Sequence, residues 1–237
     1  MDLGLTDRVV LIVGGSGYLG SAAAREFVRE GAHVVLGGRD RARLERVAGE
    51  LGGGTSVVVL DTRDEPSVRA VVDAVVAEHG RLDVLVNTAA PPADRLDPAR
   101  DRDPAQILEA IDAKALGYLR TSVAAIPAMR AAGFGRIIQI AGQNSRLTAS
   151  VTATARNVVV DTAAKALADD LAGTGVTVNV VAPGAVLDDP PAEVAPGRPG
   201  ASTPAQVAAT ILFLASEAAG GISGETIAVG HRVRGVQ

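Results

Sequence analysis

The stretch that decides the fold is Val13-Gly14-Gly15-Ser16-Gly17-Tyr18-Leu19-Gly20. It follows a short apolar run, Val9 to Val13, whose continuous hydrophobicity predicts a fully buried strand of a parallel sheet. It leads into residues 21–30, which we predict to be a helix that ends at Gly31. The sequence therefore predicts a strand, a glycine-rich turn and a helix, in that order.

Each glycine of this turn has a physical role. Gly14 permits the tight turn, Gly17 lets the backbone approach a diphosphate, and Gly20 lets helix and strand pack closely. The free N–H groups at the start of a helix attract an anion to the same point. We therefore predict a dinucleotide site here, formed by Gly14, Ser16, Gly17, Tyr18, Leu19 and Gly20. The alternative is a tight turn that binds no ligand.

Strand-like and helical patterns alternate along the rest of the chain. We expect further strands at 33–36, 56–60, 82–86, 136–140, 177–181 and 226–229, and helices at 41–51, 65–79, 104–127, 156–172 and 204–216. This alternation predicts one doubly wound α/β domain of the Rossmann type over residues 1–237. About seven parallel strands would lie between two layers of helices, in a three-layer α/β/α arrangement.

A proline-rich segment interrupts the pattern near the C-terminus. Six of the 12 prolines lie between Pro183 and Pro204, where the chain cannot continue a sheet. We predict a flap over a ligand at about residues 183–203, and a plain surface loop is the alternative.

Composition excludes several classes of function. The net charge of -4 offers no basic surface for nucleic acid or for a membrane. With no cysteine there are no disulfides and no cysteine nucleophile, and the three histidines lack metal-ligand spacing, so we expect no metal site. No apolar run reaches the roughly 20 residues of a membrane span. The N-terminus has no signal-peptide pattern, and we expect a cytoplasmic protein.

Residues after the second strand favour one dinucleotide over the other. An acidic side chain at this point would bind the ribose diol of NAD, but Gly38 stands there instead. Arg39 can pair with a 2′-phosphate, which favours NADP, with NAD as the weaker alternative. Ligands of open α/β sheets bind at the carboxyl ends of the strands, and we therefore add as cofactor contacts Asp61, Thr62, Asn87 and Ala89. For Asp61 or Asn87 taken alone, capping of the strand end is the alternative that we favour.

At this point the whole chain resembles a short-chain dehydrogenase/reductase. The resemblance rests on the glycine turn, Asp61, Leu85-Val86-Asn87-Thr88-Ala89-Ala90, Val178-Asn179-Val180-Val181-Ala182-Pro183-Gly184 and Gly221-Ile222-Ser223-Gly224-Glu225-Thr226. It implies a seven-stranded sheet, hydride transfer to or from a small carbonyl or alcohol substrate, and a homodimer or homotetramer built on the two long middle helices. It also implies that the backbone of Pro183 and Gly184 holds the nicotinamide. The threonine that the family has four residues after this glycine is Asp188 here.

The catalytic tetrad that the resemblance implies, Asn-Ser-Tyr-Lys, is missing. Alignment of the motifs places Lys114 at the asparagine, Gly142 near the serine, Ala153 at the tyrosine and Asn157 at the lysine. No tyrosine follows Tyr118, so a shift of a residue or two does not restore the tetrad. The chain therefore resembles a divergent member of this family.

Other side chains must then supply the chemistry. Lys114 and Tyr118 are four residues apart on one predicted helix, and a nearby ammonium would lower the pKa of the phenol. The alternative, which we favour for Tyr118, is that its ring packs against a neighbouring helix. The amides of Gln143 and Asn144 can orient a carbonyl, and Asn157 can bind a cofactor ribose.

Three hypotheses remain open. The first is an atypical NADP(H)-dependent oxidoreductase with Lys114, Gln143, Asn144 and Asn157 as candidate catalytic residues. The second is a non-redox enzyme on the same scaffold, a cyclase, isomerase or lyase. The third is a catalytically inactive partner subunit that keeps the dinucleotide. The complete glycine turn favours the first, and the missing tetrad favours the other two.

Overall fold

Parallel strands form the centre of the molecule. The computed structural model describes residues 2–91, 95–145, 150–194 and 199–231, and within them seven strands pair into one sheet. The strands are β1 (Val9–Val13), β2 (His33–Gly38), β3 (Thr55–Val59), β4 (Val84–Asn87), β5 (Gly135–Ile140), β6 (Val176–Pro183) and β7 (Thr226–Val229). Their order across the sheet is β3-β2-β1-β4-β5-β6-β7. The doubly wound fold predicted from the sequence is confirmed.

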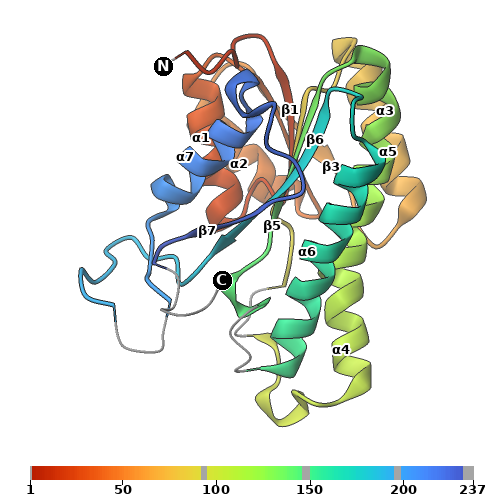
Figure 1. Ribbon diagram of the computed structural model, residues 1–237. Helices are drawn as coiled ribbons and strands as arrows, with labels where there is room; N and C mark the ends of the chain where they lie inside the picture. The colour runs from red at the N-terminus through yellow and green to blue at the C-terminus, as the bar shows by residue number, and fades with distance from the viewer. Residues whose placement is uncertain (1, 92–94, 146–149, 195–198, 232–237) are drawn as a thin grey trace.

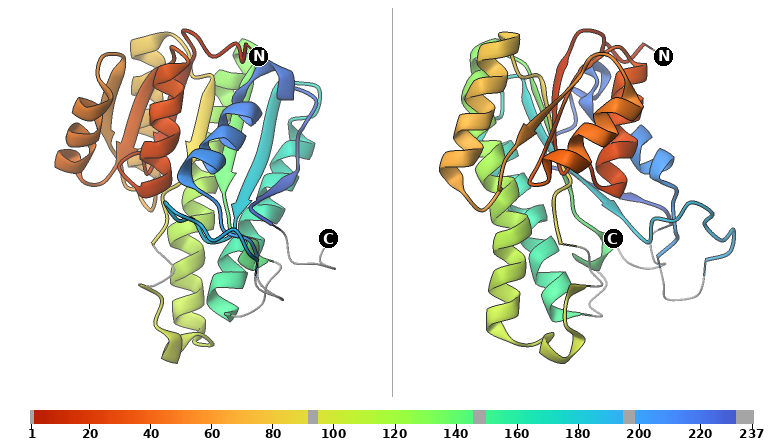
Figure 2. Two further views of the ribbon diagram at one scale, coloured as in Figure 1. Left: turned by 90° about the vertical axis from the view of Figure 1, so that its left-hand side faces the viewer. Right: turned by 180° about the vertical axis from the view of Figure 1, so that it is seen from behind.

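Helices cover both faces of this sheet (Figures 1 and 2). One face carries α1 (Tyr18–Arg29), α2 (Arg41–Leu51) and α7 (Pro204–Ala215). The other carries α3 (Glu65–His79), α4 (Pro104–Ile111), α5 (Gly117–Ala132) and α6 (Val151–Asp170). In the described part of the chain, no helix combines the length and the apolar character needed to cross a membrane.

Each face of the sheet buries its own apolar cluster. Because side chains of a strand point alternately to the two faces, the neighbours Leu11 and Ile12 enter opposite clusters. Phe27 of α1 packs with Ile12 on one face, and Met129 of α5 lies in the cluster of Leu11 on the other. A strand buried on both sides must be apolar throughout, which is why β1 is a continuous hydrophobic run.

The glycine turn works by close approach of backbone to backbone. Gly14 has φ +89°, and a methyl group there would lie 2.5 Å from Thr88 Oγ1 and 2.6 Å from the backbone N of Ala89. A methyl group on Gly20 would lie 2.2 Å from the carbonyl O of Gly14. The turn can therefore lie against the end of β4 and the start of α1 only without these side chains.

The long helix predicted over residues 104–127 is divided in the structure. A π-helical turn, Asp112–Leu116, joins α4 to α5, and α5 continues through Pro127 to Ala132. Single π turns inside α-helices change which residues share a face. Lys114 lies inside the π turn and Tyr118 at the start of α5, so their predicted common face does not follow from their spacing.

The helix predicted at 156–172 begins earlier, at Val151. The hydroxyl of Ser150 accepts a hydrogen bond from the Ala153 N–H, and the carboxylate of Asp101 accepts bonds from the N–H groups of Val151 and Thr152. Asp101 lies about fifty residues away in sequence, ahead of α4. This long-range cap extends α6 back over Ala153, so that Ala153 and Asn157 lie on one helix.

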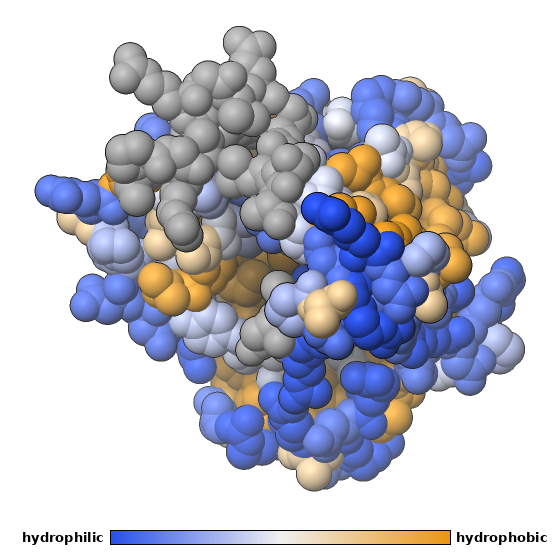
Figure 3. Space-filling model, turned by 90° about the horizontal axis from the view of Figure 1, so that it is seen from below, coloured by the Kyte–Doolittle hydropathy of each residue, from blue (hydrophilic) through white to orange (hydrophobic). Residues whose placement is uncertain are grey.

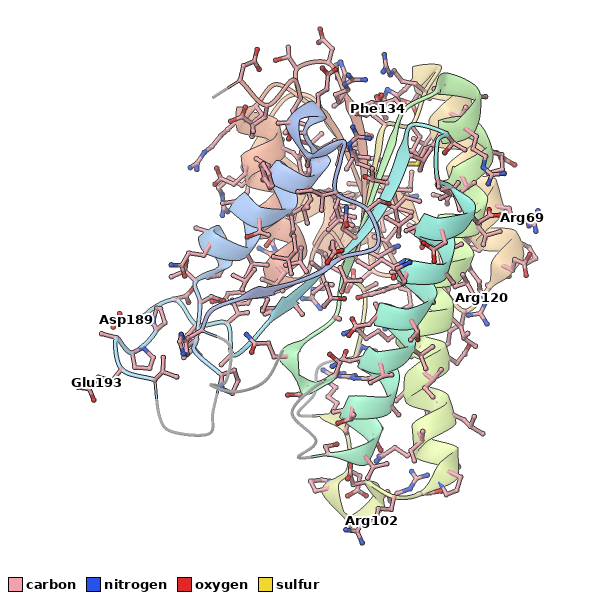
Figure 4. The ribbon with its side chains drawn as sticks, viewed as in Figure 1. Arg69, Arg102, Arg120, Phe134, Asp189 and Glu193 are labelled. Carbon is pink, nitrogen blue, oxygen red and sulfur yellow. The ribbon has the colours of Figure 1, made fainter. Side chains whose placement is uncertain are left out.

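The proline-rich segment leaves the sheet and returns beside its own start. β6 includes Pro183, so the first residues of the predicted flap belong to the strand. Beyond it, Val186 forms a parallel bridge with Ser202, and the Leu187 N–H donates to the Ser202 carbonyl over 2.9 Å. Near the far end of the loop, Asp189 and Glu193 point away from the body of the molecule (Figure 4).

We predict opposite effects for two glycine-to-alanine substitutions. Gly20→Ala should lower the free energy of unfolding by about 1–3 kcal/mol, because the added methyl overlaps the Gly14 carbonyl. Gly49→Ala in α2, where the methyl meets nothing within 4 Å, should raise it by about 0.5–1 kcal/mol. Urea denaturation measures both, and a neutral Gly20→Ala would contradict the close approach.

Candidate active site

The candidate site lies at the carboxyl edge of the sheet. Figure 3 views the molecule from this side and shows a shaded hollow with an apolar floor. The glycine turn after β1, the segments after β4 and β5, and the end of β6 meet at this edge. Ligands of open α/β sheets bind at such an edge.

The glycine turn fits a dinucleotide diphosphate. Gly17 precedes α1 with extended backbone, and no side chain caps the first N–H groups of the helix. Gly17 and Tyr18 are exposed, and Ser16 and Leu19 are partly buried. Thr88, at the position of the family's second asparagine, donates its hydroxyl to the carbonyls of Val13 and Gly14. The turn is thus braced by β4. The N–H groups of Gly14, Gly15 and Gly17 donate to carbonyls of the protein, and the uncapped N–H groups at the start of α1 remain available to an anion.

The side chains of the other predicted cofactor contacts differ in how far they already bond to or pack against the protein. Asp61 accepts a hydrogen bond from the Arg63 N–H, as strand-end capping would require, and Thr62 packs where Gly117 leaves room. Asn87 is fully buried and accepts a 2.8 Å bond from Thr121 of α5. The predicted cofactor contact of Asn87 therefore rests on its backbone.

Gly38 and Arg39 present an open surface at the end of β2. A methyl group on Gly38 would meet only Leu44, at an ordinary 3.6 Å, so packing does not demand glycine there. Arg39 is exposed and makes no hydrogen bond or ion pair with any described residue. The place where NAD-binding proteins carry a carboxylate is vacant, with a free guanidinium beside it.

Lys114 and Asn157 lie together at the centre of the site. The ammonium Nζ of Lys114 donates to Asn157 Oδ1 over 2.7 Å and to the Ala141 carbonyl over 3.1 Å. Both side chains are buried. A methyl group on Gly142 would lie 3.2 Å from the Asn157 amide nitrogen, so Gly142 and Asn157 pack against each other. Lysine and asparagine thus occur in each other's family positions and still meet.

Burial changes the acidity of Lys114. Loss of hydration, and then the positive charge of Arg156, lower the pKa of its ammonium group to about 7, while Asp161 opposes this shift. An amine with this pKa can hold or release a proton near neutral pH. It therefore has the property required of a general acid or base.

The proposed pairing of Tyr118 with Lys114 as acid and base is wrong. Tyr118 is 1% exposed and its ring lies in the apolar cluster of the α5 face, as our alternative expected. Burial raises the pKa of its phenol above the ordinary value, and only Arg156 counteracts this. The phenol is thus a weaker acid than in water, because the phenolate would be buried.

Gln143 and Asn144, which follow β5, make hydrogen bonds that hold the protein's own structure together, and these bonds were not predicted. Gln143 is buried, and its Nε2 donates one hydrogen bond to the Val229 carbonyl at the end of β7. Asn144 is exposed, and its backbone carbonyl accepts a bond from Thr154 of α6. Their role in orienting a carbonyl stays a prediction. The Ala153 side chain is buried on α6, and its methyl group cannot exchange a proton.

Two contacts at this edge were not expected from the sequence. The Tyr18 hydroxyl donates a 2.6 Å hydrogen bond to Asp188, which joins the glycine turn to the proline-rich segment just beyond Pro183 and Gly184. Arg156 is buried one residue before Asn157, and its Nη1 donates to the Pro91 carbonyl over 2.9 Å. The signal for Arg156 was present: it is a cation in a helical stretch otherwise built of Ala, Val, Thr and Asn.

Comparisons with known proteins agree with this geometry. A model of the short chain dehydrogenase family matches residues 8–196. The (2S)-[(R)-hydroxy(phenyl)methyl]succinyl-CoA dehydrogenase subunit of Thauera aromatica is 34% identical over 94% of this chain and 92% of its own. The 3-oxoacyl-[acyl-carrier-protein] reductase of Salmonella typhimurium is 31% identical over 94% of this chain and 95% of its own. The crystal structure of gox2181 superposes with a TM-score of 0.82 at 26% identity, over 94% of both chains.

Lys114 predicts a pH dependence of stability. Its pKa is about 7 in the folded protein and close to 10.5 in an unfolded chain, so between these values the unfolded chain binds more protons. The free energy of unfolding should therefore rise as pH increases from about 7 toward 10, relative to the variant Lys114→Met. Urea denaturation of both proteins across this range measures the effect. Parallel pH profiles would show that the ammonium is not buried.

Proposed function

Because the chain belongs to the short-chain dehydrogenase/reductase family, we propose that it is an atypical NADP(H)-dependent oxidoreductase that interconverts a small carbonyl compound and its alcohol. The family uses NAD(P), and the relatives described above are a dehydrogenase subunit and a reductase. The observation that carries the proposal is the buried Lys114–Asn157 pair beside the nicotinamide-binding segment.

The glycine turn and β2 support the choice of cofactor. Gly14, Ser16, Gly17, Tyr18, Leu19 and Gly20 would hold the diphosphate, with Pro183 and Gly184 at the nicotinamide. The exposed Arg39 would bind the 2′-phosphate, next to the room left by Gly38. A bound nicotinamide dinucleotide supplies or accepts the hydride.

In this proposal Lys114 does the proton chemistry that the family assigns to tyrosine. Its Nζ would give a proton to the substrate oxygen on reduction and take it back on oxidation. Asn157 and the Ala141 carbonyl orient the amine, since each accepts one of its hydrogen bonds. The pKa of about 7 keeps both protonation states accessible at neutral pH.

A partner subunit without catalysis of its own is the second candidate. It is favoured by the empty tyrosine position at Ala153 and by the relative from Thauera aromatica, whose name describes a subunit of a dehydrogenase. In that case the dinucleotide would bind and no substrate would turn over. Non-redox chemistry at Lys114 also stays open, because a neutral amine is a nucleophile.

We also propose a homodimer or homotetramer formed through the middle helices. Large apolar side chains are exposed on α4, the π turn and α5, at Leu108, Leu116 and Val123. On the neighbouring α6, Val151 and Val158 are exposed seven residues apart. Apolar side chains gathered on adjacent helices are typical of a surface that another copy covers.

The cofactor preference can be tested by equilibrium binding. Arg39→Ala should raise the Kd for NADPH by about 10- to 100-fold, because a charge-assisted contact is lost, and should leave the Kd for NADH nearly unchanged. Arg46→Ala removes the same charge from an exposed arginine of α2 that pairs with Glu50, and should change neither Kd. Equal effects on both nucleotides would contradict the 2′-phosphate contact.

Turnover tests the role of Lys114. With NADPH and a panel of aldehydes and ketones, Lys114→Met should lower kcat by about 10²- to 10⁴-fold, since a general acid contributes that much. Lys165→Met, at the chain's other lysine, removes a surface ammonium that pairs with Asp169 and should retain activity.

The outcomes separate the candidates. NADPH binding without turnover of any carbonyl, in the wild-type protein alone, would favour the partner subunit or a non-redox reaction. Full activity in Lys114→Met would remove this lysine from the mechanism. Failure to bind either nucleotide would overturn the cofactor site itself.

A further inference from the structure

Arg156 is a buried cation that pairs with no anion among the described residues. Its side chain on α6 is 5% exposed, and its Nη1 donates to the Pro91 carbonyl. Nε is buried with no hydrogen-bond partner, and within the described residues neither Nε nor Nη2 faces a carboxylate that pairs with it. A buried charge that lacks a partner is strongly destabilising, so a protein keeps one where a ligand supplies the opposite charge.

A second buried polar group near Arg156, on Tyr118, also lacks a hydrogen-bond partner among the described residues. The hydroxyl of Tyr118 is buried and makes no hydrogen bond with any described residue. The charge of Arg156 lowers the pKa values of both Tyr118 and Lys114, which places the guanidinium near both side chains. Asp161 raises the pKa of Lys114, whereas burial lowers the pKa of Arg156 and no carboxylate of the described residues opposes that shift.

Arg156 lies close in the chain and in the fold to the Lys114–Asn157 pair. It precedes Asn157, whose side chain accepts the hydrogen bond from Lys114. Pro91, which Arg156 contacts, follows β4 at the carboxyl edge of the sheet. An anion on this guanidinium would therefore lie at the same end of the sheet as Lys114.

We propose that Arg156 binds the carboxylate of an acidic substrate, which makes oxo acids and their hydroxy acids the substrate class of this site. The inference rests on the proposed function, because it gives the reacting carbonyl an anionic neighbour. With Nη1 committed to Pro91, Nε and Nη2 remain along one edge of the guanidinium. Along this edge the two N–H groups can donate parallel hydrogen bonds to the two oxygens of a carboxylate. Tyr118 can donate a further hydrogen bond from its unpartnered hydroxyl.

The test compares acids with neutral ketones of the same size. Acetoacetate and pentane-2,4-dione have equal numbers of heavy atoms and differ in one carboxylate. Calorimetric titration of the NADPH-loaded protein should show that acetoacetate binds about 10- to 100-fold more tightly. Pyruvate and levulinate vary the distance from carboxylate to carbonyl, and inorganic phosphate tests whether a phosphate-bearing substrate uses the same fork.

Variants assign the effect to Arg156. Arg156→Met should abolish the preference for the acid, and Arg156→Lys should restore less than half of it, since an ammonium lacks the fork. Tyr118→Phe should weaken acid binding alone. Arg69→Met removes a positive charge from the exposed outer side of α3 and should leave the preference intact (Figure 4).

Each result decides the inference. Equal affinity of the wild-type protein for the acid and the ketone would overturn it, whether or not the variants fold. An unchanged preference in Arg156→Met would also overturn it, and so would tighter binding of phosphate than of every carboxylate. Acid binding that depends on Arg156, without any turnover, would support the inference and contradict the proposed oxidoreductase.

Discussion

The close approach of Gly14 to its neighbours determines the geometry of the whole carboxyl edge. Its backbone lies against Thr88 and Ala89 of the β4 end and against Gly20 of α1, at distances where a single methyl group would overlap. This contact places the start of α1 over the ends of β1 and β4. The segments that follow β4, β5 and β6 then converge on the same edge, because parallel strands all end there.

The proton chemistry that we propose at this edge would come from other elements than in the family. A lysine from the π turn between α4 and α5 meets an asparagine from α6, in positions exchanged relative to the family tetrad. The ammonium is desolvated and lies near the guanidinium of Arg156, so its pKa falls to about 7. In our proposals, these two buried cations would supply a proton for the reaction and a binding group for an anion.

Prediction from the sequence succeeded where the tertiary fold requires the same residues that the local sequence pattern shows. The continuous apolar run of Val9–Val13 and the glycine turn after it are required by a doubly buried strand and by a close backbone approach, and both occur as predicted. It failed where a distant group decides. The start of α6 depends on Asp101, and Lys114, in the π turn, donates its hydrogen bond to Asn157 of α6. Gln143, after β5, donates a hydrogen bond to the carbonyl of Val229 at the end of β7, two strands away, and no local sequence pattern indicates this contact.

The sequence by itself determined the layer architecture, the place of the diphosphate turn and the loss of the catalytic tyrosine. These follow from periodicity, from residues without side chains and from the absence of a residue type. Only the tertiary structure decided which side chains share the site. Lys114 meets Asn157, and Arg156 is buried with no anion from the part of the chain that the structure describes. Acidity and charge pairing depend on desolvation and on distances between helices, and local sequence patterns predict neither of them.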